Sequence, residues 1–152
     1  MSYSYEFGKF TSEIKEWKVM GHAGSYVGQW TDKPQGFGLF YNEGMLFEGY
    51  WEAGIFQGYG RSFVMESPLS AESPVMLQGR FEDNQISNFG KMRSPSTHYR
   101  GMFKDNMFHG FGNLYDSQDT QWQGIFHNGS ISGVAYTVSG NDEVWIGTVQ
   151  ER

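Results

Sequence analysis

Four histidines and several pairs of acidic residues are the side chains of this sequence whose types suit metal binding or acid–base catalysis. The histidines are His22, His98, His109 and His127, and none stands four residues from another. Two histidines four residues apart would lie on one face of a helix, where their imidazoles can share a metal ion. For His109 and His127, a solvated side chain in a turn or loop is the simpler interpretation. We therefore predict no metal site and no cofactor.

The other candidate groups also lack the partners that catalysis requires. Asp116/Asp119 and Asp142/Glu143 flank expected turns, where carboxylates favour solvation and turn hydrogen bonds. Gly-Phe-Gly occurs twice, but no Gly-Lys-Ser or Gly-Lys-Thr follows it, so the sequence lacks a phosphate-binding loop. It also has no cysteine and no Gly-x-Ser-x-Gly motif. We therefore predict that the protein is not an enzyme.

The composition limits the classes of partner. The 152 residues include 17 acidic and 11 basic side chains, which give a net charge of −6. Nucleic acids and anionic membranes both require a concentrated basic surface, so neither is an expected partner. Aromatic residues make up 18% of the chain and there are 21 glycines. Aromatic rings, rather than aliphatic side chains, must therefore supply most of the apolar surface that folding buries.

A pattern of aromatic-x-Gly-x-aromatic, in which Leu and Val replace an aromatic residue in two copies, recurs six times along the chain. The copies start at Tyr26, Phe47, Leu77, Tyr99, Trp122 and Trp145, at intervals of 21, 30, 22, 23 and 23 residues. A period of this size indicates a repeat architecture, in which each unit buries its apolar face against its neighbours. Most copies continue with a Gly or Asn at a turn position, such as Gly54 and Gly129, and then with Gly-x-Gly or a close variant. The pattern predicts one β-hairpin per repeat.

The spacing also defines the organisation of the chain. Residues 26–152 form the repeat array, and residues 1–25 form an N-terminal segment. One long interval holds an insert at about residues 66–75 whose prolines and serines predict a loop that projects from the array. In the N-terminal segment, Trp17–Met20 fits a strand that pairs with the first edge of the array. Thr11–Glu16 fits a single helical turn as an alternative.

A short stretch near the start, Phe7-Gly8-Lys9-Phe10, has the composition of a degenerate half-repeat. No stretch of the sequence approaches the roughly 18 apolar residues that a membrane-spanning helix needs. We therefore expect no membrane-spanning helix in this sequence.

The order aromatic, Gly, aromatic, turn Gly and Gly-x-Gly, at offsets 0, 2, 4, 7, 11 and 13, resembles the MORN repeat. The resemblance covers about residues 26–149, and the copy that begins at Phe47 matches at every position. It implies an all-β fold: an elongated, single-layer antiparallel β-sheet of MORN-type β-hairpin repeats, bent into a shallow trough. It also implies a scaffold or protein–protein interaction module, as a structural subunit of a larger assembly.

The resemblance leaves several functional alternatives open. Members of the family serve at cilia and in the cytoskeleton, which implies a cytoplasmic location of that kind. A mitochondrial or other large complex is the alternative location. One alternative function is a peripheral membrane or phospholipid-binding adaptor, for which no residue motif is present here. Another is a regulatory subunit of a separate enzyme.

Side chains alternate between the two faces of a strand, so the residues at offsets 0, 2 and 4 share one face. The expected repeat core is Tyr26, Trp30, Phe47, Trp51, Phe81, Tyr99, Phe103, Trp122 and Phe126. A further ladder stands between the paired glycines: Phe37, Tyr59, Phe89, Phe111 and Val134. We interpret this ladder as additional core. The alternative is that part of it stays open as a trough for a helix or an extended segment of a partner.

The opposite face and the last repeat supply the candidate partner-binding residues, which are Tyr50, Met102, Ile125, Ile146 and Trp145. Met102, Ile125 and Ile146 stand where a solvated face should be polar, and an exposed apolar patch normally marks an interface. Isolated surface hydrophobes are the alternative interpretation. Residues 143–149 are expected to form an uncapped edge strand, which invites pairing with a strand of a partner or of a second copy in a homodimer.

Overall fold

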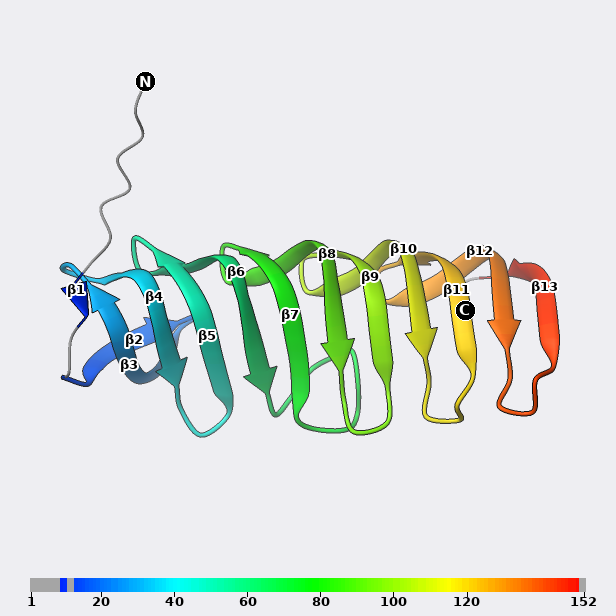
Figure 1. Cartoon of the computed structure of the whole chain (residues 1–152), viewed down its shortest axis with the longest axis horizontal. Coiled ribbons are helices and arrows are strands. Elements are labelled where there is room, and N and C mark those ends of the chain that lie inside the picture. Colours follow the sequence, from blue (N-terminus) through cyan, green and yellow to red (C-terminus); the bar gives the residue numbers. More distant parts are fainter. Residues whose placement is uncertain (1–8, 11–12, 151–152) are drawn as a thin grey trace, which may run out of the picture.

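The computed structural model describes residues 9–10 and 13–150, which form one antiparallel sheet of 13 strands. The strands are β1 (Lys9–Phe10), β2 (Lys15–Val19), β3 (His22–Trp30), β4 (Pro34–Tyr41), β5 (Met45–Glu52), β6 (Ile55–Val64), β7 (Val75–Glu82), β8 (Gln85–Arg93), β9 (His98–Lys104), β10 (Met107–Tyr115), β11 (Gln121–His127), β12 (Ser130–Val138) and β13 (Val144–Val149). From β3 onward they follow chain order along the long axis (Figure 1). The prediction of an all-β sheet of hairpin repeats is confirmed. Within this part of the chain, no helix is long and apolar enough to cross a membrane.

Two-residue turns close four of the five repeat hairpins, the exception being the hairpin of β3 and β4. Both residues of these turns have positive φ angles, a backbone conformation that matches the right-handed twist of paired strands. The turns are Ala53-Gly54, Asp83-Asn84, Asp105-Asn106 and Asn128-Gly129. The second residue of each turn also donates its backbone N–H to a carbonyl of the preceding repeat, as Gly54 does to Pro34 over 2.9 Å. Each turn therefore closes its own hairpin and joins it to the previous one.

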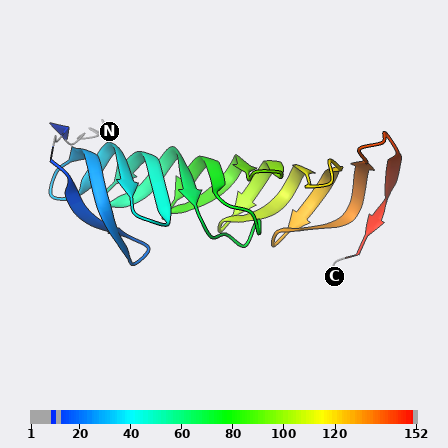
Figure 2. The ribbon, with the colours of Figure 1, turned by 90° about the horizontal axis from the view of Figure 1, so that it is seen from below.

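A row of glycines crosses the sheet, each lying opposite the next in the strand register. The row contains Gly28, Gly38, Gly49, Gly60, Gly79, Gly90, Gly101, Gly112 and Gly124, and it continues through Ala135 to Gly147. The pairing within each of these repeat hairpins shifts register beside the row, as it does between Gly49 and Trp51. Such irregularities bend a strand, and the strands in Figure 2 are visibly bent. The sheet is therefore a long trough with an inner and an outer face.

Aromatic side chains fill the inner face of the trough. Tyr26, Phe47, Trp51, Phe81, Tyr99, Phe103 and Phe126 are buried, and Trp30 and Trp122 are half-buried. The rings meet mainly edge to face, with centroids 5.4 Å apart between Tyr26 and Trp51 and 5.2 Å apart between Phe47 and Phe56. Tyr99 instead stacks on Phe108 at 3.8 Å. Successive repeats thus share one continuous aromatic core.

Several members of this core lie on the second strand of a repeat hairpin, at positions that the sequence analysis did not assign to the core. They are Phe40, Phe56, Ile86 and Phe108, all fully or almost fully buried. Phe56, Ile86 and Phe108 each stand at the second position after a hairpin turn. An apolar residue at that position was therefore a usable signal.

Two buried tyrosines also stabilise the bend in their strands. The Tyr26 hydroxyl donates to the carbonyl oxygen of Gln29 over 2.8 Å, and the Tyr99 hydroxyl donates to that of Met102 over 2.9 Å. Burial raises the pKa of both phenols above the ordinary tyrosine range. Both hydroxyls therefore remain protonated, and able to donate, to a higher pH than an exposed tyrosine does.

The N-terminal segment pairs with the first repeat. β2 pairs with the first half of β3, and β1 pairs with its end. The strand predicted at Trp17 is present, and Lys15 and Glu16 belong to it rather than to a helical turn. The Trp17 indole N–H donates to the Gly54 carbonyl oxygen over 2.9 Å, which ties this strand to the second repeat. Residues 7–8 of the expected half-repeat and residues 11–12 lie outside the described residues.

The insert at residues 66–75 is an irregular connection between β6 and β7 that contacts the array at two points. Leu69 packs against the aromatic core. The Glu72 carboxylate accepts hydrogen bonds from the Ser96 backbone N–H, over 2.9 Å, and from its hydroxyl, over 2.6 Å. Leu69 thus holds the loop against the core, and Glu72 holds it to the connection between β8 and β9. The proline and serine content of the insert does not reveal these contacts.

Candidate functional site

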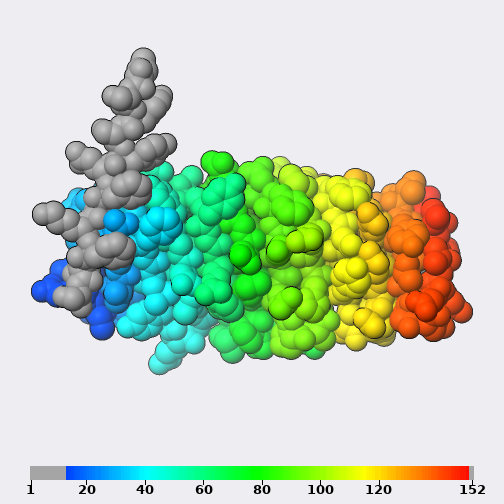
Figure 3. All heavy atoms as spheres, viewed as in Figure 1, coloured from blue at the N-terminus to red at the C-terminus, as the bar shows by residue number. Residues whose placement is uncertain are grey.

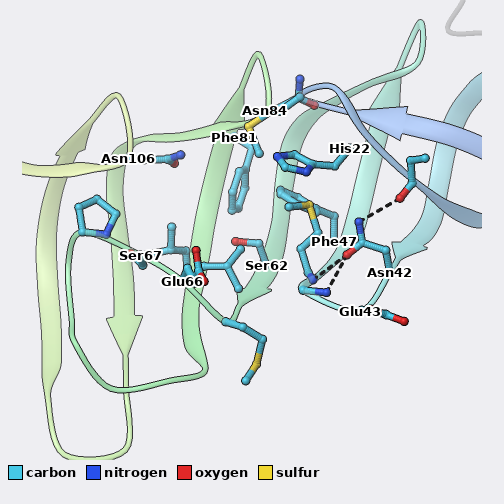
Figure 4. A pocket seen from close by; sticks show the side chains of 18 residues that line it. His22, Asn42, Glu43, Phe47, Ser62, Glu66, Ser67, Phe81, Asn84 and Asn106 are labelled. Atoms are coloured by element: carbon cyan, nitrogen blue, oxygen red, sulfur yellow. Dashed lines mark hydrogen bonds between the residues drawn. The ribbon is translucent and has the colours of Figure 1, made fainter.

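A groove of about 630 Å³ opens on the inner face in the middle of the array (Figure 4). It exists because Ser62 stands between the bulky side chains of Phe47 and Leu77 in the strand register. The polar side chains labelled in Figure 4, apart from Ser62, come mainly from the turns and loops around it: His22, Asn42, Glu43, Glu66, Ser67, Asn84 and Asn106.

This inner groove offers little to a ligand. Its apolar floor is already covered, since Phe47, Leu77 and Phe81 expose 5% or less of their surface. Its amides serve the fold: Asn84 and Asn106 accept hydrogen bonds from the backbone N–H groups of Phe56 and Ile86. Binding sites combine accessible apolar surface with convergent polar groups, and the groove presents few of either.

The outer face presents the larger apolar surface. Phe37, Tyr59, Phe89, Phe111 and Val134 are 56% to 74% exposed, so the interpretation of this ladder as core is wrong. The physical reason lies in the alternation of side chains along a strand. A Cβ on Gly112 would meet the ring of Tyr99 inside the trough, so the preceding residue must point outward. The same geometry holds at Gly38, which lies under Tyr26.

Each ladder residue lies opposite another residue of the outer face on the next repeat. Phe37 faces Tyr50, Phe89 faces Met102, and Phe111 faces Ile125. Together these residues form what we call the outer stripe: Phe37, Tyr50, Tyr59, Phe89, Met102, Phe111, Ile125 and Val134. Arg80 interrupts it between Tyr59 and Phe89. The stripe reaches along the array from β4 to β12.

The structure distributes the five predicted partner-binding residues over both faces. Tyr50, Met102 and Ile125 belong to the outer stripe, where Tyr50 packs edge to face on Phe37 with centroids 5.5 Å apart. Ile146 lies opposite Tyr136 on the outer face and is 70% exposed. Trp145 is different, because its ring lies over Gly147 on the inner side of β13. The sequence analysis thus missed the ladder, which is the most exposed part of the stripe.

The histidines do not assemble a metal site in the described part of the chain. His109 and His127 lie on β10 and β11 rather than in turns, with ring centroids 5.3 Å apart, so their predicted positions are wrong. Gly110 on β10 pairs with Phe126 on β11, so the residues next to this pair, His109 and His127, face each other. No group of three or more His, Asp or Glu side chains here is arranged to hold a metal ion.

Comparison with known proteins identifies three of the repeats. A family model described as MORN repeat matches residues 47–62, 78–97 and 99–120. Over 114 residues, or 72% of this chain, the sequence is 27% identical to alsin of Homo sapiens and to alsin of Pan troglodytes. That stretch spans only 7% of the length of each alsin chain. The similarity therefore concerns one part of those proteins.

Proposed function

We propose that this chain, a MORN-repeat protein, is a non-catalytic module that binds other proteins through its outer stripe, as a structural subunit of a larger assembly. The observation that carries the proposal is the exposure of aromatic and aliphatic side chains along most of the array. Contiguous exposed apolar surface marks interaction sites in soluble proteins, and aromatic residues supply much of the energy at such sites.

The dimensions of the outer stripe suit a protein partner. Neighbouring strands lie about 4.8 Å apart, so the stripe from β4 to β12 is roughly 40 Å long. An extended segment or a helix of a partner can lie along such a surface. A location at a cilium or in the cytoskeleton is part of the proposal and rests on the family alone.

The test compares the proteins that bind to three forms of the chain in extracts of its own cells. Phe89→Ser/Phe111→Ser removes two exposed rings from the stripe, and Met65→Ser removes an exposed apolar side chain outside it. We expect the stripe variant to lose a set of bound proteins that the Met65 variant retains. Each lost protein is then purified, and its affinity should fall at least about tenfold with the stripe variant.

Circular dichroism and thermal unfolding establish that both variants remain folded. An identical set of bound proteins for the stripe variant and the unchanged chain would contradict the proposal. Loss of binding to vesicles, without loss of any protein, would favour the membrane adaptor instead.

A further inference from the structure

A block of basic side chains lies beside the outer stripe in the middle of the array. Lys91 and Arg93 on β8 lie opposite Arg100 and His98 on β9, and all four side chains are exposed. We call these four residues the basic block. The two strands are neighbours near the centre of the array in Figure 1, and Figure 3 shows that the surface follows chain order along this axis.

The positive charge of the basic block is not neutralised within the described residues. Lys91, Arg93 and Arg100 belong to none of the ion pairs there. Elsewhere on the outer face, Arg61 lies 2.6 Å from Glu48, and Arg80 lies 3.6 Å from Glu82. Like charges opposite each other destabilise a sheet, and the chain as a whole carries a net charge of −6. This local cost is offset when an anionic partner binds.

The strands on either side of the basic block, β7 and β10, place neutral side chains in register with it. Met76 and Gln78 flank the basic block from β7, and Asn113 and Tyr115 flank it from β10. These residues and the basic block line a groove of about 510 Å³. Among the described residues, no carboxylate therefore lines this groove.

The surroundings of the groove distinguish between kinds of anionic ligand. Phe89 on β8 and Met102 on β9 belong to the outer stripe and lie two residues from Lys91 and Arg100, on the same face of the sheet. A phosphate group has no apolar part to place against these side chains, whereas a polypeptide combines carboxylates with apolar side chains. The site is therefore better suited to an acidic peptide than to a phosphate.

We infer that the basic block binds an acidic, extended segment of a protein partner. Carboxylates of the segment lie against Lys91, Arg93 and Arg100. Phe89 lies two residues from Lys91 on the same face of β8, about 6.6 Å along the strand, and receives an apolar side chain of the same segment. This inference rests on the proposed function and names the chemistry of the partner.

The test selects peptides from a displayed library of random dodecapeptides against two forms of the whole chain. One form is unchanged, and the other is Lys91→Gln/Arg100→Gln. We expect the unchanged chain to enrich peptides rich in Asp and Glu that also carry an aromatic or aliphatic residue. The tightest of these, followed by fluorescence anisotropy, should lose about tenfold in affinity with the variant and should bind less tightly as salt is added.

A matched control removes two positive charges that already have partners. Arg61→Gln/Arg80→Gln lies on the same face and should change the affinity of the selected peptide less than about threefold. The inference is overturned by selected peptides without acidic bias, or by the same bias in the Lys91→Gln/Arg100→Gln selection. It is also overturned if only phosphatidylserine vesicles distinguish the two forms. These outcomes leave the proposed function standing, because that function fails only if the stripe variant retains every bound protein.

Discussion

The two faces of the sheet use the same types of side chain for different purposes. On the inner face, Trp51 and Phe56 expose none of their surface and pack against rings of neighbouring repeats. On the outer face, Phe89 and Phe111 expose 56%. The difference shows that the high aromatic content has two origins, since folding accounts for the inner rings and does not account for the outer ones.

The glycine row produces this difference. Inner rings lie directly over glycines, so the repeats pack closely across the bend, as Tyr99 does over Gly112. The residue before each such glycine is then forced outward, whatever its polarity. A polar side chain at this outward position would be compatible with the fold. The choice of Phe at 37, 89 and 111 and of Tyr at 59 therefore points to a use other than folding.

The largest expected effect is the difference in stability between a variant that lacks one ring of the inner face and a variant that lacks one ring of the outer face. Trp51→Ala should lower the free energy of unfolding by about 3–5 kcal/mol, because it leaves a cavity among Tyr26, Phe40 and Phe56. Phe89→Ala should lower it by about 0.5 kcal/mol or less, as for most exposed positions. Denaturant unfolding of the two variants measures the difference. Similar losses for both would contradict the division of the aromatic residues between the two faces.

A smaller effect is expected from the glycine row itself. A Cβ on Gly112 would lie 2.5 Å from ring carbons of Tyr99, so Gly112→Ala should displace that ring and cost about 1–3 kcal/mol. Gly44→Ala is the control, because the nearest atom to its Cβ is the Asn42 side-chain oxygen at 3.9 Å. Thermal unfolding should separate the two variants clearly. If Gly44→Ala lowers the stability as much, the loss reflects the general effect of replacing glycine by alanine and not a clash with the Tyr99 ring.

Much of the fold follows from the sequence, because the repeat period and the turn residues are local signals. The period that starts at Tyr26 identifies the hairpins, and the turn positions at Gly54 and Gly129 fall where the chain needs a positive φ angle. The faces of the second strands are harder to predict. To assign these faces, the alternation of side chains must be followed across the turn and across the register shift beside the glycine row. That shift depends on pairing between strands, which the sequence of one strand does not show.

The candidate surface was only partly predictable for the same reason. Met102 and Ile125 stand on first strands, where alternation alone assigns them to the outer face. Phe89 and Phe111 stand on second strands and were assigned to the wrong face. The basic block also depends on pairing, since Lys91 and Arg100 become neighbours only when β8 and β9 are in register. A sequence read along one strand cannot bring them together.

The smallest expected effect separates a contribution of the turns from that of either face. Asn106 has a positive φ angle, and its side-chain oxygen accepts a hydrogen bond from the Ile86 N–H of the preceding repeat over 2.8 Å. Asn106→Gly keeps the turn but removes this acceptor, so we expect a loss of about 1 kcal/mol in denaturant unfolding.

Asn88→Gly is the matched control for this turn variant. Asn88 also has a positive φ angle, but its side chain makes only an exposed hydrogen bond to Glu82 over 3.3 Å. Its replacement should change the free energy of unfolding by about 0.5 kcal/mol or less, since glycine adopts this conformation freely. An equal loss in both variants would mean that added freedom of the unfolded chain, and not the bond between repeats, determines the effect. A loss confined to Asn106→Gly would show that Asn at the turn joins adjacent repeats, a contact that glycine at the same position in other repeats cannot make.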